Sequence, residues 1–277
     1  MNPTIEREKR HCAHNYHPLP VVLKRGKGVF VWDEAGNKYI DMMSAYSAVS
    51  HGHANPRLVR LVQKQVATLD YCMGFQVTNN KALELAERAT ALAPEGISRC
   101  FFTNSGSESV DTALKIALGY HRARGEGNRT RLIGREKGYH GVNFGGMSVG
   151  GMVPNRKVFS AALLPGVDHL RHTLDIERNA FSRGLPAHGV ELAEDLERLC
   201  QLHDGSNIAA VIVEPRPEFV PGARAIVVVA HVVFTCPLQL HRLADFAGNP
   251  GCLDHRVVAQ PAAEAAAQTH PSIGNSA

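Results

Sequence analysis

The second part of the sequence contains no lysine. All nine lysines lie within the first 157 residues, and the 120 residues that follow contain none. Covalent mechanisms that form a Schiff base depend on a lysine amine. Any such reaction of this chain must therefore take its lysine from the first 157 residues.

Other absences exclude whole classes of protein. The six cysteines are scattered without a Cys-x-x-Cys pair, which is typical of a reduced, intracellular chain. No run of about 18 apolar residues occurs and the start is polar, so we expect a cytoplasmic protein with no membrane partner. P-loop, Gly-x-Ser-x-Gly and His-Glu-x-x-His motifs are also missing, which argues against NTPases, serine hydrolases and zinc proteases.

The charges and histidines exclude two further kinds of site. Residues 1–29 carry six Lys/Arg against two Asp/Glu, so they hold the whole net charge of +4 and the rest is neutral. A nucleic-acid partner, which needs a basic face on a folded domain, is not expected. The closely spaced histidines lack a cysteine or carboxylate at ligand spacing, and we expect no metal from them. They are His11, His14, His17, His51, His53, His169 and His172.

The order of apolar segments predicts an α/β fold. With 44% hydrophobic and 20% charged residues the chain is globular in composition. Residues 19–43 read as a hairpin around a turn at 33–37, and residues 56–69 and 81–92 have helical spacing. From residue 99 a strand at 100–103, a helix to about 124, a strand at 131–133, a helix at 190–202 and a strand at 208–213 follow. This alternation favours a mostly parallel sheet with flanking helices.

The character of the sequence changes after Pro215. Residues 216–277 hold six prolines and an alanine-rich stretch, but no lysine, tyrosine or tryptophan. A strand over 226–229 is conceivable, yet no amphipathic helix of normal length follows it. We therefore expect an atypical tail, either disordered or an independent extension.

A small polar turn links the strand at 100–103 to the next helix. It reads Asn104-Ser105-Gly106-Ser107-Glu108-Ser109. The first amides of a helix have no intrahelical acceptor and carry partial positive charge, so such a turn can bind a phosphate. Alternatively, Ser105 and Glu108 form a capping box with no ligand at all. The residues alone leave both interpretations open.

Two other segments fall at the same predicted edge of the sheet. Gly138-Tyr139-His140-Gly141 follows the strand at 131–133, and Glu214-Pro215 follows the strand that ends at Val213. Ligands of open α/β sheets bind at the carboxyl ends of the strands. Taken together, the turn, the aromatic ring and the acid predict a ligand site on one rim, although each alone is commonly structural.

These motifs, in this order, resemble the class III pyridoxal-phosphate aminotransferases. Residues from about 64 to 215 are most similar to the ω-amino acid (β-alanine):pyruvate branch. The front of the chain is more similar to ornithine aminotransferase, on the segments His14 to Pro20 and Ser44 to Val49. The resemblance covers about residues 14–215 and implies the large domain of fold type I.

The resemblance also implies roles for particular residues. Ser105, Gly106 and Ser107 fall on the phosphate cradle of pyridoxal 5′-phosphate. Tyr139 falls on the ring-stacking aromatic, with His140 beside it, and Glu214 on an acid near the cofactor ring. Tyr46 matches a substrate-side tyrosine of the ornithine branch. The implied reaction moves an amino group from an ω-amino acid or amine, or from ornithine, to a 2-oxo acid such as pyruvate, in a homodimer.

The chain departs from the family after Pro215. The family's Schiff-base lysine and the aspartate that protonates the pyridine nitrogen belong to that region, and neither is present. Lys115 and Lys137 are poor substitutes by position. The sequence therefore predicts three parts: an N-terminal segment (1–55), a partial cofactor domain (56–215) and the tail (216–277). A frameshift or truncation near Arg216, which the coding DNA would reveal, explains the tail, and an inactive remnant that only binds ligand or dimerises is the alternative to an enzyme.

Overall fold

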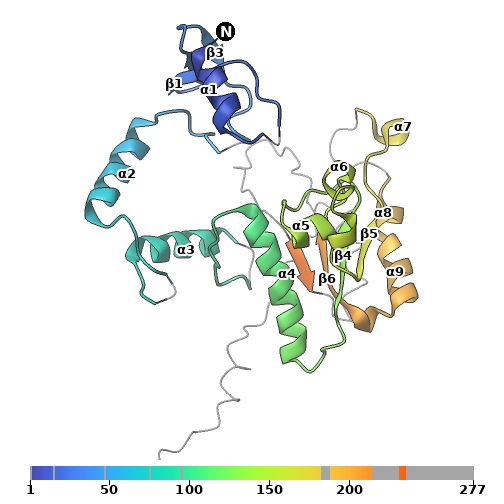
Figure 1. Cartoon of the computed structure of the whole chain (residues 1–277). Helices are drawn as coiled ribbons and strands as arrows, with labels where there is room; N and C mark the ends of the chain where they lie inside the picture. The colour runs from blue at the N-terminus through green and yellow to red at the C-terminus, as the bar shows by residue number, and fades with distance from the viewer. Residues whose placement is uncertain are drawn as a thin grey trace, which may run out of the picture. The chain divides into compact units, whose positions relative to one another are not determined.

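The computed structural model describes residues 2–14, 16–46, 48–74, 76–93, 96–181, 188–213 and 231–234 (Figure 1). The chain divides into two compact units, Met1–Glu84 and Leu85–Ala277. Glu214, the possible strand at 226–229 and nearly all of the predicted tail lie outside the described residues. Among the described residues, no helix has both the length and the apolar character needed to span a membrane.

The first unit is built around a small antiparallel sheet. Helix α1 (Pro3–His11) precedes three strands, β1 (Leu23–Lys27), β2 (Phe30–Asp33) and β3 (Lys38–Ile40), which pair in that order. The hairpin predicted around residues 33–37 is confirmed by the β2–β3 pairing. Its turn is fixed by Asp33, whose carboxylate accepts hydrogen bonds from Asn37 N (2.8 Å) and Tyr39 Oη (2.8 Å).

Little of this first unit is buried. Val31 in β2 is its only buried hydrophobic residue among those described. Helix α2 (Pro56–Thr68) confirms the predicted helix and starts at an Asn55 cap, yet it contains no buried residue. Helix α3 (Asn80–Leu92), also predicted, begins in this unit, ends in the next and likewise has none buried.

The second unit contains a four-stranded sheet in the order β5-β4-β6-β7. Strands β4 (Arg131–Arg135), β5 (Val167–Leu170) and β6 (Ile208–Val213) are parallel, and β7 (His231–Phe234) is antiparallel to β6. All residues of β6 from Ile208 to Ile212 are buried. This pattern is expected for a central parallel strand covered on both faces, and it confirms the predicted α/β class.

Helices cover the two faces of this sheet. On one side α4 (Gly106–Ala123) packs Val110, Leu114 and Ala117 against β4 and β6. On the other side α9 (Asp195–His203) packs Leu196 and Leu199 against a cluster that contains Ile133 of β4 and Ile208 and Val211 of β6. The two helices flank the strands in Figure 1. From Ala210 onward successive residues of β6 alternate between the two clusters, whereas Ala209 and Ala210, where the β4–β6 register shifts, both belong to the α4 side.

Short helices connect the strands of the second unit. They are α5 (Phe144–Val149), α6 (Val153–Arg156), α7 (Ile176–Asn179), α8 (Val190–Ala193) and the 3₁₀ turns at Ser160–Ala162 and Gly205–Asn207. Helix α5 lies so close to β4 that a Cβ on Gly134 would be 1.8 Å from the carbonyl oxygen of Val149. Only glycine fits at that position.

Two predictions for the second unit need correction. The strand expected at 100–103 is absent, and Phe101 and Phe102 are largely exposed, because none of the described strands pairs with this segment. A strand requires a neighbour for its backbone groups, whatever its apolar content. The helix expected at 190–202 is divided at Glu194 into α8 and α9. At the division the buried Asp195 accepts a hydrogen bond from Arg171 N (3.1 Å), just after β5.

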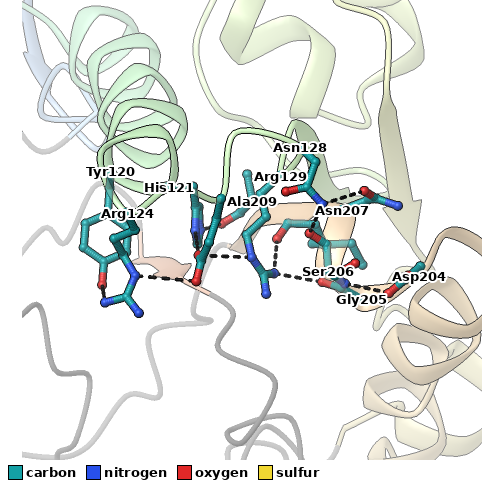
Figure 2. A network of polar contacts seen from close by, with 12 residues as sticks. Tyr120, His121, Arg124, Asn128, Arg129, Asp204, Gly205, Ser206, Asn207 and Ala209 are labelled. Carbon is teal, nitrogen blue, oxygen red and sulfur yellow. Dashed lines mark hydrogen bonds and ion pairs between the residues drawn. The ribbon is translucent and has the colours of Figure 1, made fainter.

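A buried polar cluster joins the end of α4 to the start of β6 (Figure 2). The ring of His121 contacts Glu126 Oε2 through Nδ1 (2.8 Å) and the carbonyl oxygen of Ala209 through Nε2 (3.0 Å). Both partners are oxygen acceptors, so a ring N–H on either nitrogen has an oxygen to donate to. Arg129, also buried, donates to the carbonyl oxygens of Gly205 and Ile208, each at 2.9 Å.

Glu126 ties this cluster together. Its carboxylate also pairs with Arg129 Nε at 3.2 Å. The hydrogen bond from His121, followed by the charges of Arg129 and Arg124, lowers the pKa of Glu126 below its ordinary value despite some desolvation. Through these ion pairs and hydrogen bonds to backbone oxygens, the cluster holds the first residues of β6 against the end of α4 and the turn that follows it.

Candidate functional site

The predicted polar turn caps helix α4. Ser105 is extended and its Oγ accepts a hydrogen bond from Glu108 N at 3.2 Å. The Glu108 carboxylate accepts from Asn104 N (2.8 Å) rather than from Ser105 N, so the cap departs from the capping box by one residue. The amides of Gly106 and Ser107 have no acceptor within the helix. Capping therefore uses only part of the donor set and leaves the anion interpretation intact.

The structure brings the Gly-Tyr-His-Gly loop against this turn. The loop follows β4, and Val142 N, just beyond it, donates to Ser107 Oγ at 3.0 Å. Gly141 has a φ of +105°, and a Cβ there would lie 2.7 Å from Ser107 Oγ. Because its oxygen is engaged as an acceptor, the Ser107 hydroxyl proton is directed elsewhere and can be donated to a ligand.

The two central residues of the loop have opposite environments. Tyr139 is 49% exposed, whereas His140 is 3% exposed. Neither ring nitrogen of His140 has a hydrogen-bond partner among the described residues. Burial, with smaller contributions from Arg135 and His169, lowers the pKa of His140 to about 4. The imidazole is therefore neutral near pH 7, and it is buried next in sequence to an accessible aromatic ring.

A second contact between α4 and the following segment was missed by the sequence reasoning. Asp111 Oδ1 accepts a hydrogen bond from Gly146 N at 2.9 Å. Asp111 is four residues after Ser107 and thus on the same face of the helix. This contact could have been inferred from that spacing together with the glycines at 141, 145 and 146, which allow a close approach of the backbone.

An open cavity of about 310 Å³ lies along the first turns of α4 and the segment before it. Lys115 projects at its border with Glu108 and Asp111, and Phe101 and Asn143 complete its walls. Lys115 is exposed. A cation and two carboxylates beside the phosphate-type turn make this a polar, solvent-accessible site.

The remaining predicted residues are not part of this assembly. Tyr46 belongs to the first unit, where it is 88% exposed and follows Ser44 and Ala45 in a run of positive φ angles (50°, 48° and 53°). Glu214 lies outside the described residues. No three His, Cys, Asp or Glu side chains gather as metal ligands in the part of the chain that the structure describes.

The family model for "Aminotransferase class-III" matches residues 11–234. The chain belongs to the class III aminotransferase family. Class III aminotransferases depend on pyridoxal 5′-phosphate and have fold type I. The parallel sheet and the flanking helices of this chain agree with that fold. The resemblance inferred from residues 14–215 is thereby confirmed.

Curated relatives agree with this assignment. An omega-aminotransferase of Caulobacter vibrioides is 50% identical over 196 residues, which cover 71% of this chain and 44% of that protein. The omega-amino acid–pyruvate aminotransferase of Pseudomonas putida is 44% identical over 202 residues, covering 73% and 44%. The ornithine aminotransferase of Saccharomyces cerevisiae is 33% identical over 216 residues, covering 76% and 47%.

Solved structures lead to the same family. The omega transaminase from Pseudomonas jessenii in complex with PMP matches with a TM-score of 0.67 and 30% identity, over 74% of this chain and 47% of that one. This class III aminotransferase chain therefore spans about half the length of the relatives it matches.

The phosphate-type turn and the loop that contains Tyr139 are joined by the hydrogen bond from Val142 N to Ser107 Oγ. First-turn amides and a serine hydroxyl are groups that can bind a phosphate, and an exposed aromatic ring is a group that can stack on a cofactor ring. Covalent attachment of the cofactor requires a lysine, and the sequence has no lysine beyond position 157.

Proposed function

We propose that this chain binds pyridoxal 5′-phosphate between the α4 turn and the Tyr139 loop, and that the protein's reaction is amino transfer from an ω-amino acid or amine to a 2-oxo acid such as pyruvate. The carrying observation is the hydrogen bond from Val142 N to Ser107 Oγ, because it joins the two halves of the site. The names of the 44–50% identical relatives support the substrate class. Ornithine, favoured by the front of the sequence, is the alternative donor.

In this proposal each predicted residue has a stated task. Ser105, Gly106 and Ser107 bind the phosphate through amides, hydroxyls and the helix dipole. Tyr139 stacks on the cofactor ring, and the buried, neutral His140 beside it in the sequence adds no charge to the site. Glu214 near the ring and Tyr46 on the substrate side rest on the family resemblance alone.

Bound pyridoxal phosphate would supply the electron sink for amino transfer. The chain's own residues must bind and orient it, and a lysine must hold it and move the substrate's proton. Lys115 is exposed at the cavity border and Lys137 lies just before the loop, whereas residues 158–277 contain no lysine. This observation favours a second candidate, a catalytically inactive remnant that binds cofactor or dimerises without turnover.

Borohydride trapping separates the two candidates. The protein is incubated with pyridoxal phosphate, its visible absorbance is recorded, and the reduced sample is digested and analysed by mass spectrometry. A single modified lysine with amine-to-pyruvate turnover supports the enzyme. Reversible binding with scattered or no lysine modification overturns the enzymatic candidate and supports the remnant.

The cradle has its own test. Pyridoxamine 5′-phosphate has no aldehyde, so its affinity reports non-covalent binding alone. Ser107→Ala removes a donor to a charged ligand and should weaken that affinity about tenfold. Ser160→Ala, on an exposed turn, is the control. Equal affinities of Ser107→Ala and wild type would mean that the turn serves only as a helix cap.

The rest of the proposal follows from the family. It includes a homodimer, a cytoplasmic location, and the division into an N-terminal segment (1–55), a partial cofactor domain (56–215) and a tail (216–277). Size-exclusion chromatography with light scattering of the purified chain tests the dimer.

A further inference from the structure

Helix α4 holds the following segment through two acceptors one turn apart. Ser107 Oγ accepts from Val142 N at 3.0 Å, and Asp111 Oδ1 accepts from Gly146 N at 2.9 Å. The acceptors are four residues apart on the helix, and so are the two donors on the other segment. Side chains at i and i+4 lie on one helix face, so the two bonds act as a matched pair. We call these two hydrogen bonds the α4 strap.

Glycines make the close approach possible. A Cβ on Gly145 would lie 2.5 Å from Asp111 Oδ1, and one on Gly146 would lie 2.3 Å from the carbonyl oxygen of His140. Cβ atoms are not found at such distances, so Gly145 leaves the room that the Asp111 carboxylate needs, and Gly146 leaves room for the backbone at His140. The strap is therefore a close contact between two side chains of α4 and a glycine-containing backbone segment.

Asp111 also replaces a missing helix cap. Helix α5 begins after Asn143, whose side chain makes no capping hydrogen bond. The amide of Gly146, in the first turn of α5, instead donates to Asp111 from another helix. First-turn amides need an external acceptor, and a carboxylate is a favourable one at that end of the helix dipole.

The strap fixes one end of the loop that carries Tyr139. The other end is held where Gly151 N donates to the carbonyl oxygen of Gly138 (2.9 Å) and Lys137 N donates to that of Gly151 (3.2 Å). Between these anchors the His140 ring is buried and the Tyr139 ring is accessible. These anchors lie on both sides of Tyr139 in the sequence, so they restrict where its ring lies relative to the phosphate-type turn.

We propose that Asp111 is a positioning residue that holds the Tyr139 ring in register with the phosphate cradle through Gly146 and α5. This inference rests on the proposed function, because it presumes that the cradle and the ring bind one ligand. Asp111 acts through the loop and needs only an oxygen acceptor at Oδ1. Asparagine keeps that acceptor, whereas alanine removes it.

Two ligands of different size test the role. Pyridoxamine 5′-phosphate uses both cradle and ring, and inorganic phosphate uses the cradle alone; their affinities for the full chain are measured by equilibrium dialysis and by competition. Asp111→Ala should weaken pyridoxamine phosphate about tenfold, the size of one lost charged hydrogen bond, while inorganic phosphate changes less than about twofold. Asp111→Asn should restore the wild-type ratio. Asp70→Ala, at an exposed aspartate of the first unit, is the matched control.

Hydrogen exchange of the ligand-free chain gives an independent readout. Asp111→Ala should accelerate exchange of the Gly146 amide, and Asp111→Asn should not. If Asp111→Ala fails to fold, Gly145→Ala replaces it, because the added Cβ pushes the strap apart from the other side.

The outcomes are separable. Equal weakening of both ligands, or an unchanged ratio, overturns the positioning role but leaves cofactor binding standing. A wild-type chain that binds neither ligand overturns the proposed function and the positioning role with it.

Discussion

Helices α2 and α4 have the same kind of apolar periodicity but differ in the burial of their apolar side chains. In α4 that periodicity buries Val110, Leu114 and Ala117 against a sheet, whereas α2 exposes Leu61, Val62 and the other members of its stripe. The difference lies in what the helix faces. A stripe at 3.6-residue spacing predicts a helix, but burial requires a second surface. The first unit has a three-stranded sheet with one buried hydrophobic residue among those described, and the second has a two-sided core.

The sharpest way to break the second unit alone is Gly134→Ala. Its Cβ would overlap the carbonyl oxygen of Val149, and the cost of forcing α5 away from β4 should exceed about 4 kcal/mol. Limited proteolysis and circular dichroism should show loss of the second unit. Trp32, the sole tryptophan of the chain, lies in β2 and should keep its emission.

Gly127→Ala is the matched control, since a Cβ there meets nothing within 4 Å. If Gly134→Ala unfolds like wild type in urea, the close packing of α5 on β4 is wrong.

Removing the clamp on β6 should cost somewhat less. Arg129→Ala deletes two hydrogen bonds to the carbonyl oxygens of Gly205 and Ile208 and removes one of the partners of Glu126, which keeps His121. Losing two hydrogen bonds from a buried guanidinium costs about 3 kcal/mol. The urea midpoint of the second unit should fall, whereas Arg122→Ala, on the exposed end of α4, should leave it unchanged. Similar midpoints for both variants would show that the clamp adds no stability.

The next largest effect is expected from acid, which should destabilise the second unit through His140. The pKa of His140 is about 4 in the folded chain and near 6.5 when exposed. The unfolded state therefore binds a proton first as pH falls, so the stability is complete above about pH 6.5 and is lost progressively toward pH 4. Thermal unfolding of the second unit should shift down by several degrees between pH 7 and 5.

His140→Leu should flatten that dependence, because the leucine side chain does not titrate. A variant whose melting temperature falls with pH as steeply as that of wild type would assign the effect to other groups. His169, whose pKa is also lowered mainly by burial, is the next to test.

The smallest effect is expected in the first unit. Leu61→Ala removes an exposed side chain from α2 and should change stability by less than about 0.5 kcal/mol. Leu114→Ala, the same substitution in the core of the second unit, should cost about 3 kcal/mol. Denaturant unfolding followed by circular dichroism measures both. A large loss for Leu61→Ala would mean that α2 is covered in solution.

Local patterns predicted the elements that local forces decide. The cap at Ser105 and the hairpin at 33–37 depend on nearby residues and were predicted correctly. The strand at 208–213 was also predicted correctly from its six consecutive apolar residues, although it pairs with the distant β4. The strand expected at 100–103 was wrong, because an apolar run does not show whether a distant strand will pair with it. The short helix α5 gave no signal, since its six residues are held by α4 and β4 rather than by their own propensity.

The candidate site divides in the same way. Ser105–Ser107 and Tyr139–His140 were found from motifs and the rule that ligands bind at the carboxyl ends of strands. The sequence placed both segments on one rim of the sheet, and the structure added the hydrogen bond that joins them, from Val142 N to Ser107 Oγ. The contact of Asp111 with Gly146, which joins residues 35 positions apart, came with the structure alone. Glu214 and Tyr46 remain predictions from the resemblance.

His121 has one more consequence. Its ring lies between a carboxylate and a carbonyl oxygen and is almost wholly shielded from water. A ring N–H in such a place is shielded from solvent by its oxygen acceptor and should exchange slowly, which a proton NMR spectrum can follow. The chain thus carries two native reporters that need no labelling: the indole of Trp32 for its first unit and the imidazole of His121 for its second.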